Sequence, residues 1–219
     1  MSTLHSYGVT LPNGCTIVHG QGANIKHPFS DIPVEMHELD PGSRRAFSGQ
    51  MGFIEFSTDF RLPRHVHIAA SSSSSSSQPV VAVQKFIAER IVVLNGVALV
   101  ELNGEIYVIP PQTLVTIAPG VPHTWTACPP GVSVPVSQGP TMTTGDPLQV
   151  IQSEGTFLML YEYEEPTAFF PTRQTATLAS VDDYERCDDL ETIRIPSLSA
   201  DQVRQRCWFV CDRTVRKPG

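Results

Sequence analysis

The stretch from Glu89 to Pro110, which reads ERIVVLNGVALVELNGEIYVIP, decides the fold of this chain of 219 residues. Short runs of apolar and β-branched residues fill it, and the pairs Asn95-Gly96 and Asn103-Gly104 interrupt them. Asn-Gly is a strong hairpin signal because a type I′ turn needs positive φ at both central residues. The stretch therefore predicts a meander of short strands joined by two hairpins.

The regions on either side of this stretch continue the strand pattern. Residues 52–60 (GFIEFSTDF) alternate before it, residues 114–127 (LVTIAPGVPHTWTA) follow it, and residues 155–165 (GTFLMLYEYEE) alternate again. Hydrophobic residues make up 41% of the chain and charged residues 17%, with 19 Pro and 15 Gly, which favours many turns over long surface helices. Several short antiparallel strands at regular spacing predict an all-β sandwich or barrel.

The chain is long enough for one well-packed domain with extensions. We expect residues 1–50 to form an N-terminal extension of strands and turns that packs on the barrel, residues 51–170 to form the barrel, and residues 171–219 to form a C-terminal segment. Seven consecutive serines, Ser71–Ser77, interrupt the barrel. Polyserine has nothing to bury and loses much entropy on ordering, so we expect a flexible loop.

The C-terminal segment contains a helix signal near residues 200–211. Ser199 is a suitable N-cap, and Gln202 stands three residues later, where a capping box requires it. Four residues then fall on one helical face, which predicts a helix docked on the outside of the barrel. They are Val203, Cys207, Val210 and Cys211.

Charge and hydropathy exclude several classes of partner. Lys and Arg number 15 against 22 Asp and Glu, a net charge of −7, so no basic surface attracts nucleic acid or anionic lipid. No stretch approaches the roughly 20 apolar residues of a membrane span, and the start of the chain lacks a secretory signal. Five cysteines at irregular spacing favour reduced thiols over a disulfide framework. We expect a cytoplasmic protein.

Three histidines and one glutamate form a candidate metal site. His65 and His67 are two residues apart in RHVHIA, and on a strand such side chains project from one face, about 7 Å apart at their Cα atoms. Glu89 begins the next predicted strand, and His123 follows the Pro119-Gly120 turn. Neutral imidazoles with one carboxylate suit a single divalent ion such as Fe, Mn, Ni, Cu or Zn and leave positions open for substrate or water.

At these residues the sequence resembles the cupin superfamily. The first cupin motif is a His-x-His pair followed by Glu, six residues and Gly, which His65, His67, Glu89 and Gly96 match in order. The second motif, a Pro/Gly turn with His three residues after the Gly, is matched at His123. The resemblance covers about residues 51–163, although 21 residues separate His67 from Glu89 where the family usually has three or four. It implies a cupin-type double-stranded β-helix (a jelly-roll barrel) and, by analogy, a homodimer.

Strand alternation predicts which side chains line the barrel interior. Residues two apart share a face, so Ile91 and Val93 should face inward with Glu89, and Trp125 with His123. The last strand presents either its odd-numbered residues or the opposite set, which includes Glu162. The candidate substrate pocket therefore consists of Ile91, Val93, Trp125, Phe157 and Met159, and Tyr161 on the same face is, with Glu89, a candidate catalytic residue.

The resemblance implies a metal-dependent enzyme, and an apolar cavity with a metal at one side suits a small, aromatic or polyketide-like substrate. An oxygenase that uses Fe(II) is the preferred interpretation, with substrate and O₂ sharing the open positions. The alternative is a non-redox isomerase, lyase or decarboxylase, in which the metal acts as a Lewis acid and Glu89 or Tyr161 moves protons. A protein that binds a small molecule without turnover is a further alternative. The sequence leaves the three open.

Overall fold

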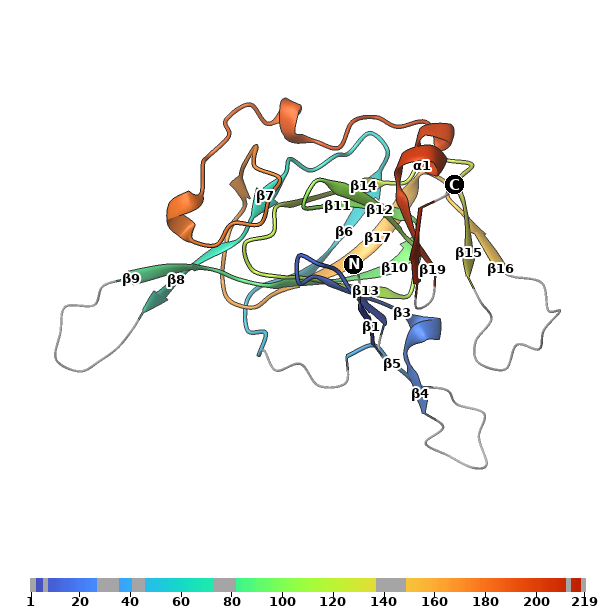
Figure 1. Ribbon diagram of the computed structural model, residues 1–219, viewed down its shortest axis with the longest axis horizontal. Coiled ribbons are helices and arrows are strands. Elements are labelled where there is room, and N and C mark those ends of the chain that lie inside the picture. Colours follow the sequence, from blue (N-terminus) through green and yellow to red (C-terminus); the bar gives the residue numbers. More distant parts are fainter. Residues whose placement is uncertain are drawn as a thin grey trace.

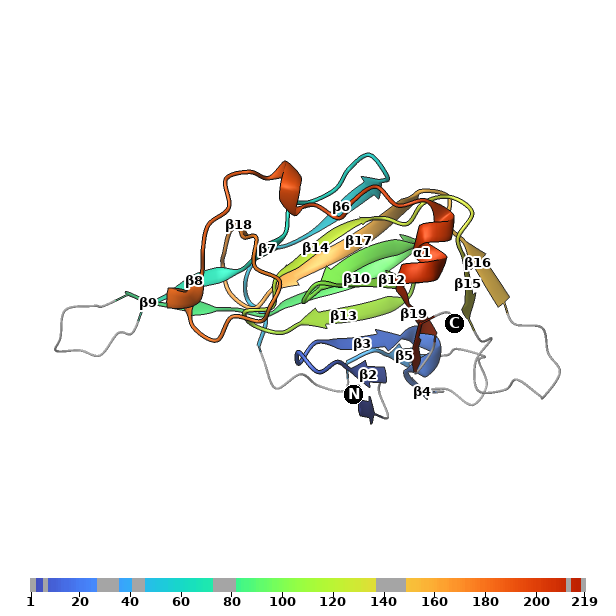
Figure 2. The same cartoon turned by 45° about the horizontal axis from the view of Figure 1, so that its top comes forward.

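Two sheets of seven strands each, packed face to face, form the main body of the computed structural model, which describes residues 3–5, 8–26, 36–40, 46–72, 82–136, 149–211 and 214–217 (Figures 1 and 2). In spatial order, sheet I contains β1 (Thr3–His5), β2 (Gly8–Thr10), β3 (Thr16–His19), β13 (Thr113–Ile117), β10 (Glu89–Gly96), β17 (Thr156–Tyr163) and β6 (Met51–Ser57). Sheet II contains β18 (Phe170–Pro171), β7 (His65–Val66), β14 (His123–Ala127), β11 (Ala98–Leu102), β12 (Glu105–Ile109), β19 (Trp208–Cys211) and β20 (Thr214–Arg216).

Smaller elements extend from these sheets. Two-stranded pairs are formed by β4 (Asn24–Lys26) with β5 (Met36–Glu38), β8 (Ile68–Ser72) with β9 (Ala82–Phe86), and β15 (Ser133–Val136) with β16 (Gln149–Gln152). The helical elements are α1 (Ala200–Arg206) and the short 3-10 turns η1 (Gly20–Gly22), η2 (Val181–Asp183) and η3 (Glu191–Ile193).

The chain crosses between the sheets as a jelly roll does. It leaves sheet I after β10, runs through β11 and β12 in sheet II, returns to sheet I as β13, and crosses again to β14. The strands β10, β13 and β17 pair antiparallel, as do β11, β12 and β14. The fold is therefore all-β and of the cupin-type jelly-roll class, as the sequence predicts.

One of the two predicted hairpins is present and the other is wrong. Asn103 and Gly104 both have positive φ, 55° and 82°, and close the two-residue hairpin between β11 and β12. At Asn95-Gly96 only Gly96 has positive φ, 71°, and the strands on its two sides lie in different sheets. Gly96 instead pairs with Phe157 after a register shift beyond Val93. Local turn preference identifies the bend but not which sheet receives the next strand.

Both ends of the chain contribute strands to the two sheets. β3 pairs antiparallel with β13, placing Thr113 opposite His19, so the N-terminal strands extend sheet I of their own chain. β19 pairs parallel with β12, placing Tyr107 opposite Trp208, and extends sheet II.

The predicted C-terminal helix is half right. Ser199 and Gln202 form the expected capping box, and Val203 packs with Leu99 on the outer face of sheet II. The helix ends at Arg206, however, and residues 208–211 form β19, so the prediction of a helix to residue 211 is wrong. Aromatic and β-branched residues favour strands, and β12 offers a free edge to pair with, which outweighs the helical spacing.

The polyserine prediction falls mostly outside the described residues. Ser71 and Ser72 belong to β8, whose pair with β9 projects from the body of the molecule (Figure 1).

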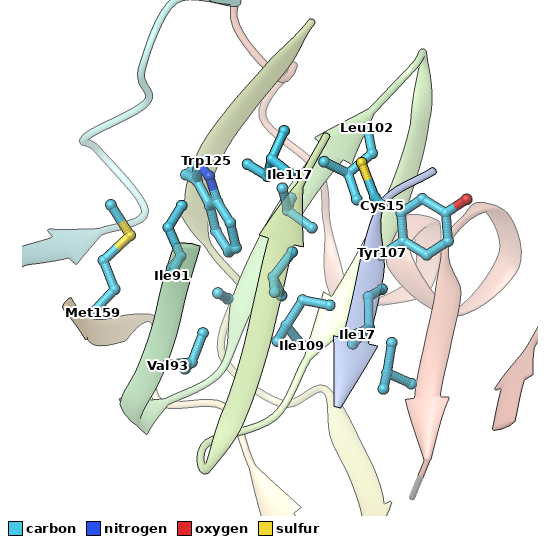
Figure 3. Close-up of a cluster of buried hydrophobic side chains, with 14 of the residues drawn as sticks. Cys15, Ile17, Ile91, Val93, Leu102, Tyr107, Ile109, Ile117, Trp125 and Met159 are labelled. Carbon is cyan, nitrogen blue, oxygen red and sulfur yellow. The ribbon is translucent and has the colours of Figure 1, made fainter. Parts of the chain in front are cut away.

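The core between the sheets is built from the inward-facing residues of both. Figure 3 shows one side of it, with Ile91 and Val93 from β10 beside Trp125 from β14 and Met159 from β17. These four side chains are at most 2% exposed. The apolar core therefore starts one inward-facing position beyond Glu89 on β10 and beyond His123 on β14.

A substitution at Gly96 probes how closely the chain packs where it crosses from sheet I to sheet II. A Cβ added there would lie 2.1 Å from the carbonyl oxygen of Thr156, whereas a Cβ at Gly131, which also has positive φ, meets nothing within 4 Å. We expect Gly131→Ala to cost about 1 kcal/mol of unfolding free energy from backbone strain alone. Gly96→Ala should cost about 3 kcal/mol or more because overlap adds to strain. Equal costs in urea unfolding would contradict the close approach.

Buried thiols predict loss of stability at alkaline pH. Burial raises the pKa of Cys15 to about 11, that of Cys128 to about 12 and that of Cys207 to about 11. Above about pH 8.5 the unfolded chain loses thiol protons that the folded chain retains, so unfolding free energy should fall by up to about 1.4 kcal/mol per pH unit and thiol. Urea unfolding in reductant at several pH values should show this fall in unfolding free energy. In Cys15→Ala the fall per pH unit should be smaller by the contribution of one thiol, and an unchanged fall would contradict the prediction.

Candidate metal centre

The four predicted ligands come together at one end of the sandwich. His65 and His123 lie opposite each other on β7 and β14 of sheet II, His67 follows β7 directly, and Glu89 begins β10 of sheet I. All four side chains are buried, with 1 to 3% of their surface exposed. The centre therefore depends on both sheets, since sheet II supplies the imidazoles and sheet I the carboxylate.

The ligand atoms converge on one point. One atom from each of the four residues lies within 4.8 Å of all the others, which marks the group as able to hold a metal ion. Glu89 Oε2 lies 2.9 Å from His123 Nε2 and 3.3 Å from His67 Nε2. The imidazole of His65 completes the group, with its ring centroid 4.4 Å from that of His123 and 4.9 Å from that of His67.

Backbone carbonyls orient all three imidazoles. His65 Nδ1 lies 2.8 Å from the carbonyl oxygen of Pro63, and His123 Nδ1 lies 2.9 Å from that of Val121. His67 Nδ1 lies 3.1 Å from the carbonyl oxygen of Ala168. A carbonyl oxygen only accepts hydrogen bonds, so each Nδ1 carries a proton and leaves Nε2 as the nitrogen that can bind a metal ion. This orientation by the second nitrogen is typical of metal-ligating histidines.

The buried atoms at the centre fit a divalent cation. His67 Nε2, His123 Nε2 and Glu89 Oε2 are buried and have no hydrogen-bond partner among the described residues. A proton shared by Glu89 and one imidazole would satisfy that pair alone, whereas one cation accepts all four lone pairs. Three nitrogens and one carboxylate oxygen are a donor set that suits a borderline transition metal. The residues present therefore fit the metal ion that the motif implies.

The charge states also suit a cation. Burial, together with the neighbouring His123 and His67, holds the pKa of His65 well below its usual value, so this imidazole stays neutral. Burial alone would raise the pKa of Glu89, but the attraction of His67 and His123 outweighs it and holds that pKa below the usual range. A neutral imidazole beside an ionised carboxylate is the state in which both bind metal.

An ion pair that the sequence did not reveal holds β7 in place. Arg64 Nε donates to Glu101 Oε1 at 2.6 Å, and both side chains are largely buried. Arg64 Nη1 also donates to the carbonyl oxygen of Arg173. Because β7 has only two residues, this contact with β11 fixes the segment that carries His65. Arg64 adjoins the histidine motif, but Glu101 lies far along the chain, and no local signal joins the two.

Two aromatic rings that the sequence analysis did not assign to the site stand against the histidines. The Phe169 ring lies 4.5 Å from that of His65 and is half exposed. The Tyr163 ring lies 4.5 Å from that of His67, and Tyr163 pairs in register with Glu89. The alternation of residues in β17 could have identified Tyr163 as inward-facing, whereas no local sequence pattern indicated that Phe169 lies at the site.

The residues predicted to line a substrate pocket all face the interior. Ile91, Val93, Trp125, Phe157 and Met159 belong to one buried cluster between the sheets.

The last strand presents its odd-numbered set inward. Glu162 lies on the opposite face, where it pairs with Arg90. Tyr161 is half buried, pairs with Ile91 and lies beside Tyr163, with ring centroids 5.2 Å apart. It is therefore one register step further from the metal ligands than Tyr163.

Comparisons with known proteins give weak likeness at most, and that to solved structures. No family model matches the chain, and no curated protein matches it. Among solved structures, a dTDP-sugar isomerase from Desulfovibrio desulfuricans G20 is similar at 15% sequence identity and a TM-score of 0.37, over 86% of this chain and 94% of that one. Function is therefore argued from the residues of the site.

None of the helices in the described ranges has the length and apolar character needed to cross a membrane.

The metal centre predicts stoichiometric binding. We expect one Zn²⁺ or Mn²⁺ per chain, and at a free concentration of 100 times Kd the ion should add about 2.7 kcal/mol to the unfolding free energy. His65→Ala and His123→Ala should each weaken binding by at least about 100-fold because one of four ligands is lost. Calorimetric titration and thermal unfolding measure both effects.

His37 provides a matched control. It is exposed and its Nδ1 lies against the carbonyl oxygen of Gly20, outside the centre, so His37→Ala should bind metal as the unmodified chain does. Unchanged affinity in both ligand variants would contradict the assigned centre.

Proposed function

We propose that this protein is a metal-dependent enzyme that binds a small organic molecule at one divalent cation and catalyses a non-redox reaction, such as isomerisation, elimination or decarboxylation. The supporting observation is the convergence of three imidazoles and the Glu89 carboxylate in one buried space, where His67 Nε2, His123 Nε2 and Glu89 Oε2 have no hydrogen-bond partner among the described residues. A cation held there supplies Lewis acidity, which polarises a carbonyl or carboxylate oxygen of the substrate.

Four protein ligands leave room for a substrate. Borderline divalent ions accept five or six ligands, so His65, His67, Glu89 and His123 would hold the ion without filling its coordination. With Nδ1 bound to backbone carbonyls, none of the three imidazoles is free to rotate away. The chain thus keeps one side of the ion rigid, and an incoming molecule needs no rearrangement of the ligands.

Tyr163 is the acid that this proposal assigns. Burial, together with the charge of Glu89, raises its pKa far above the usual value, so the hydroxyl keeps its proton. A cation held by Glu89 would offset that charge and make the phenol a better acid, and the ring of Tyr163 lies against that of His67 beside the cation position. Tyr161, next along the strand, is available for the second proton transfer that an isomerisation requires.

Phe169 covers the outer side of the centre. It rests on His65 and lies 5.6 Å from the His67 ring, while about half of its own surface remains exposed. Movement of the Phe169 ring would expose the imidazole of His65, against which it lies. We therefore place the path by which substrate enters the centre at Phe169. The adjoining carbonyl of Ala168, which holds His67, ties the same segment to the ligand geometry.

The iron oxygenase preferred from the sequence differs from this proposal in one requirement. It needs Fe(II) and O₂, whereas the non-redox reaction proceeds with Zn²⁺ or Mn²⁺ under nitrogen. The donor set of the described residues accepts any of these ions. What supports the non-redox reaction is Tyr163 against His67, with Tyr161 one register step further away, because proton transfer uses such groups and oxygen activation does not require them.

The test is turnover by protein of defined metal content. The metal-free chain is loaded with Zn²⁺, Mn²⁺ or Fe²⁺ and incubated under nitrogen and, in parallel, in air with small hydroxy acids, oxo acids, sugars and phenols, and products are followed by NMR. We expect anaerobic turnover with Zn²⁺ or Mn²⁺ and none in His123→Ala. Turnover that needs both Fe²⁺ and O₂ would replace this proposal by the oxygenase, and ligand binding without turnover would replace it by a binding protein.

Tyr163 has its own expected effect. Tyr163→Phe should retain full metal stoichiometry and lose about 10²-fold in kcat, the usual value of a positioned acid. Tyr107→Phe is the matched control because Tyr107 is also buried, on β12, but its hydroxyl points away from the core cluster (Figure 3). Equal kcat in both variants would remove the assigned acid.

A further inference from the structure

The indole N–H of Trp125 is a buried donor without an acceptor. The side chain is 1% exposed, and Nε1 has no hydrogen-bond partner among the described residues. Buried polar groups in proteins are normally paired, and an unpaired donor loses its hydration without compensation. An unpaired group of this kind calls for a partner that is not part of the described chain.

The second tryptophan of the chain shows the ordinary arrangement. Trp208, on β19, donates its indole N–H to Glu105 Oε2 at 2.9 Å. The chain contains only these two tryptophans, so they form a natural comparison of a paired and an unpaired indole.

The unpaired nitrogen belongs to the inward-facing residue that follows a metal ligand on the same strand. Trp125 follows His123 by two residues on β14, so both face the barrel interior. In Figure 3 the indole nitrogen lies at the end of the ring nearer to Ile117 and Leu102. Those residues pair in register with Glu89 and His123, respectively.

The core around the indole offers no acceptor. Ile91 and Met159 flank the ring in Figure 3, and the Phe157 ring lies with its centroid 6.2 Å away. These side chains are apolar, and the neighbouring strands use their carbonyl groups in sheet pairing. The nearest polar side chain on the same face of β14 is His123, a metal ligand whose Nε2 would be taken by a bound cation.

We propose that the indole N–H of Trp125 donates a hydrogen bond to an oxygen atom of the substrate, so that the site selects a small molecule with one oxygen for the cation and a second oxygen for the indole. This inference rests on the proposed function and adds the class of substrate. An oxo acid meets the requirement, since its carboxylate binds the cation and its ketone oxygen accepts from the indole.

The experiment measures the two indole N–H resonances by ¹⁵N NMR on the full chain loaded with Zn²⁺. Pyruvate, acetoacetate and levulinate place the ketone at increasing distance from the carboxylate, and propanoate, butanoate and pentanoate are the matched acids without it. We expect one of the oxo acids to shift the Trp125 resonance downfield and to leave that of Trp208 in place. The matched acid should leave both unchanged. Trp208→Phe assigns the two resonances.

Affinity provides a second measurement. Trp125→Phe keeps an aromatic ring and removes the donor, so it should weaken binding of the effective oxo acid by about tenfold or more. Binding of the matched acid and of Zn²⁺ should not change. Trp208→Phe should alter none of the three affinities, because its indole is already paired with Glu105.

The outcomes separate this inference from the proposed function. Failure of the full chain to bind Zn²⁺ would remove the metal centre and with it the enzyme. Zn²⁺ binding with an unmoved Trp125 resonance for all three oxo acids would overturn the inference about the indole alone. Equal loss of affinity for oxo acid and matched acid in Trp125→Phe would also overturn it, because the ring would then act through packing.

Discussion

The arrangement on which the rest depends is the meeting of four electron-rich atoms in a buried space. His123 Nε2 and Glu89 Oε2 lie 2.9 Å apart without a hydrogen bond between them, and two further imidazoles face the same point. These buried polar atoms have lost their hydration, and an unpaired polar group in the interior costs free energy. Backbone carbonyls and the Arg64–Glu101 ion pair nevertheless hold the histidine segments in this geometry. The chain gives up stability at this end of the sandwich, and a bound cation restores it.

The centre and the sandwich require each other because the ligands are divided between the sheets. Glu89 lies opposite Tyr163 and Ile117 in sheet I, and His123 lies opposite His65 in sheet II. A slip of one residue in any of these pairings would turn a ligand to the other face of its sheet. The apolar core beneath keeps the sheets apart at the distance where imidazoles and carboxylate meet. The packing of the core therefore also sets the geometry of the ligands at the end of the sandwich.

The sequence predicted what depends on local spacing and missed what depends on distant pairing. The period of two in His65 and His67, and the turn before His123, predicted that these side chains converge, and the structure brings them together with Glu89 because strand geometry orients them. The same reasoning failed at Asn95-Gly96, where the turn is real but the next strand enters the other sheet. It failed again at residues 208–211, because the edge of β12, a hundred residues earlier, decides their conformation. Glu101 and Phe169 reach the site through contacts of the same long range.

The interior changes from polar to apolar within one register step, and this limits what the site can hold. The next inward residues after Glu89 and His123 are Ile91 and Trp125, both buried in the core. A molecule bound at the cation therefore extends from a charged layer into an apolar one, where a second charged group would lose its hydration without a partner. A neutral carbonyl would lose less and would find an unpaired donor in that layer, the Trp125 N–H. The two ends of the substrate must then differ in charge, with the anionic oxygen at the metal and the neutral oxygen at the indole.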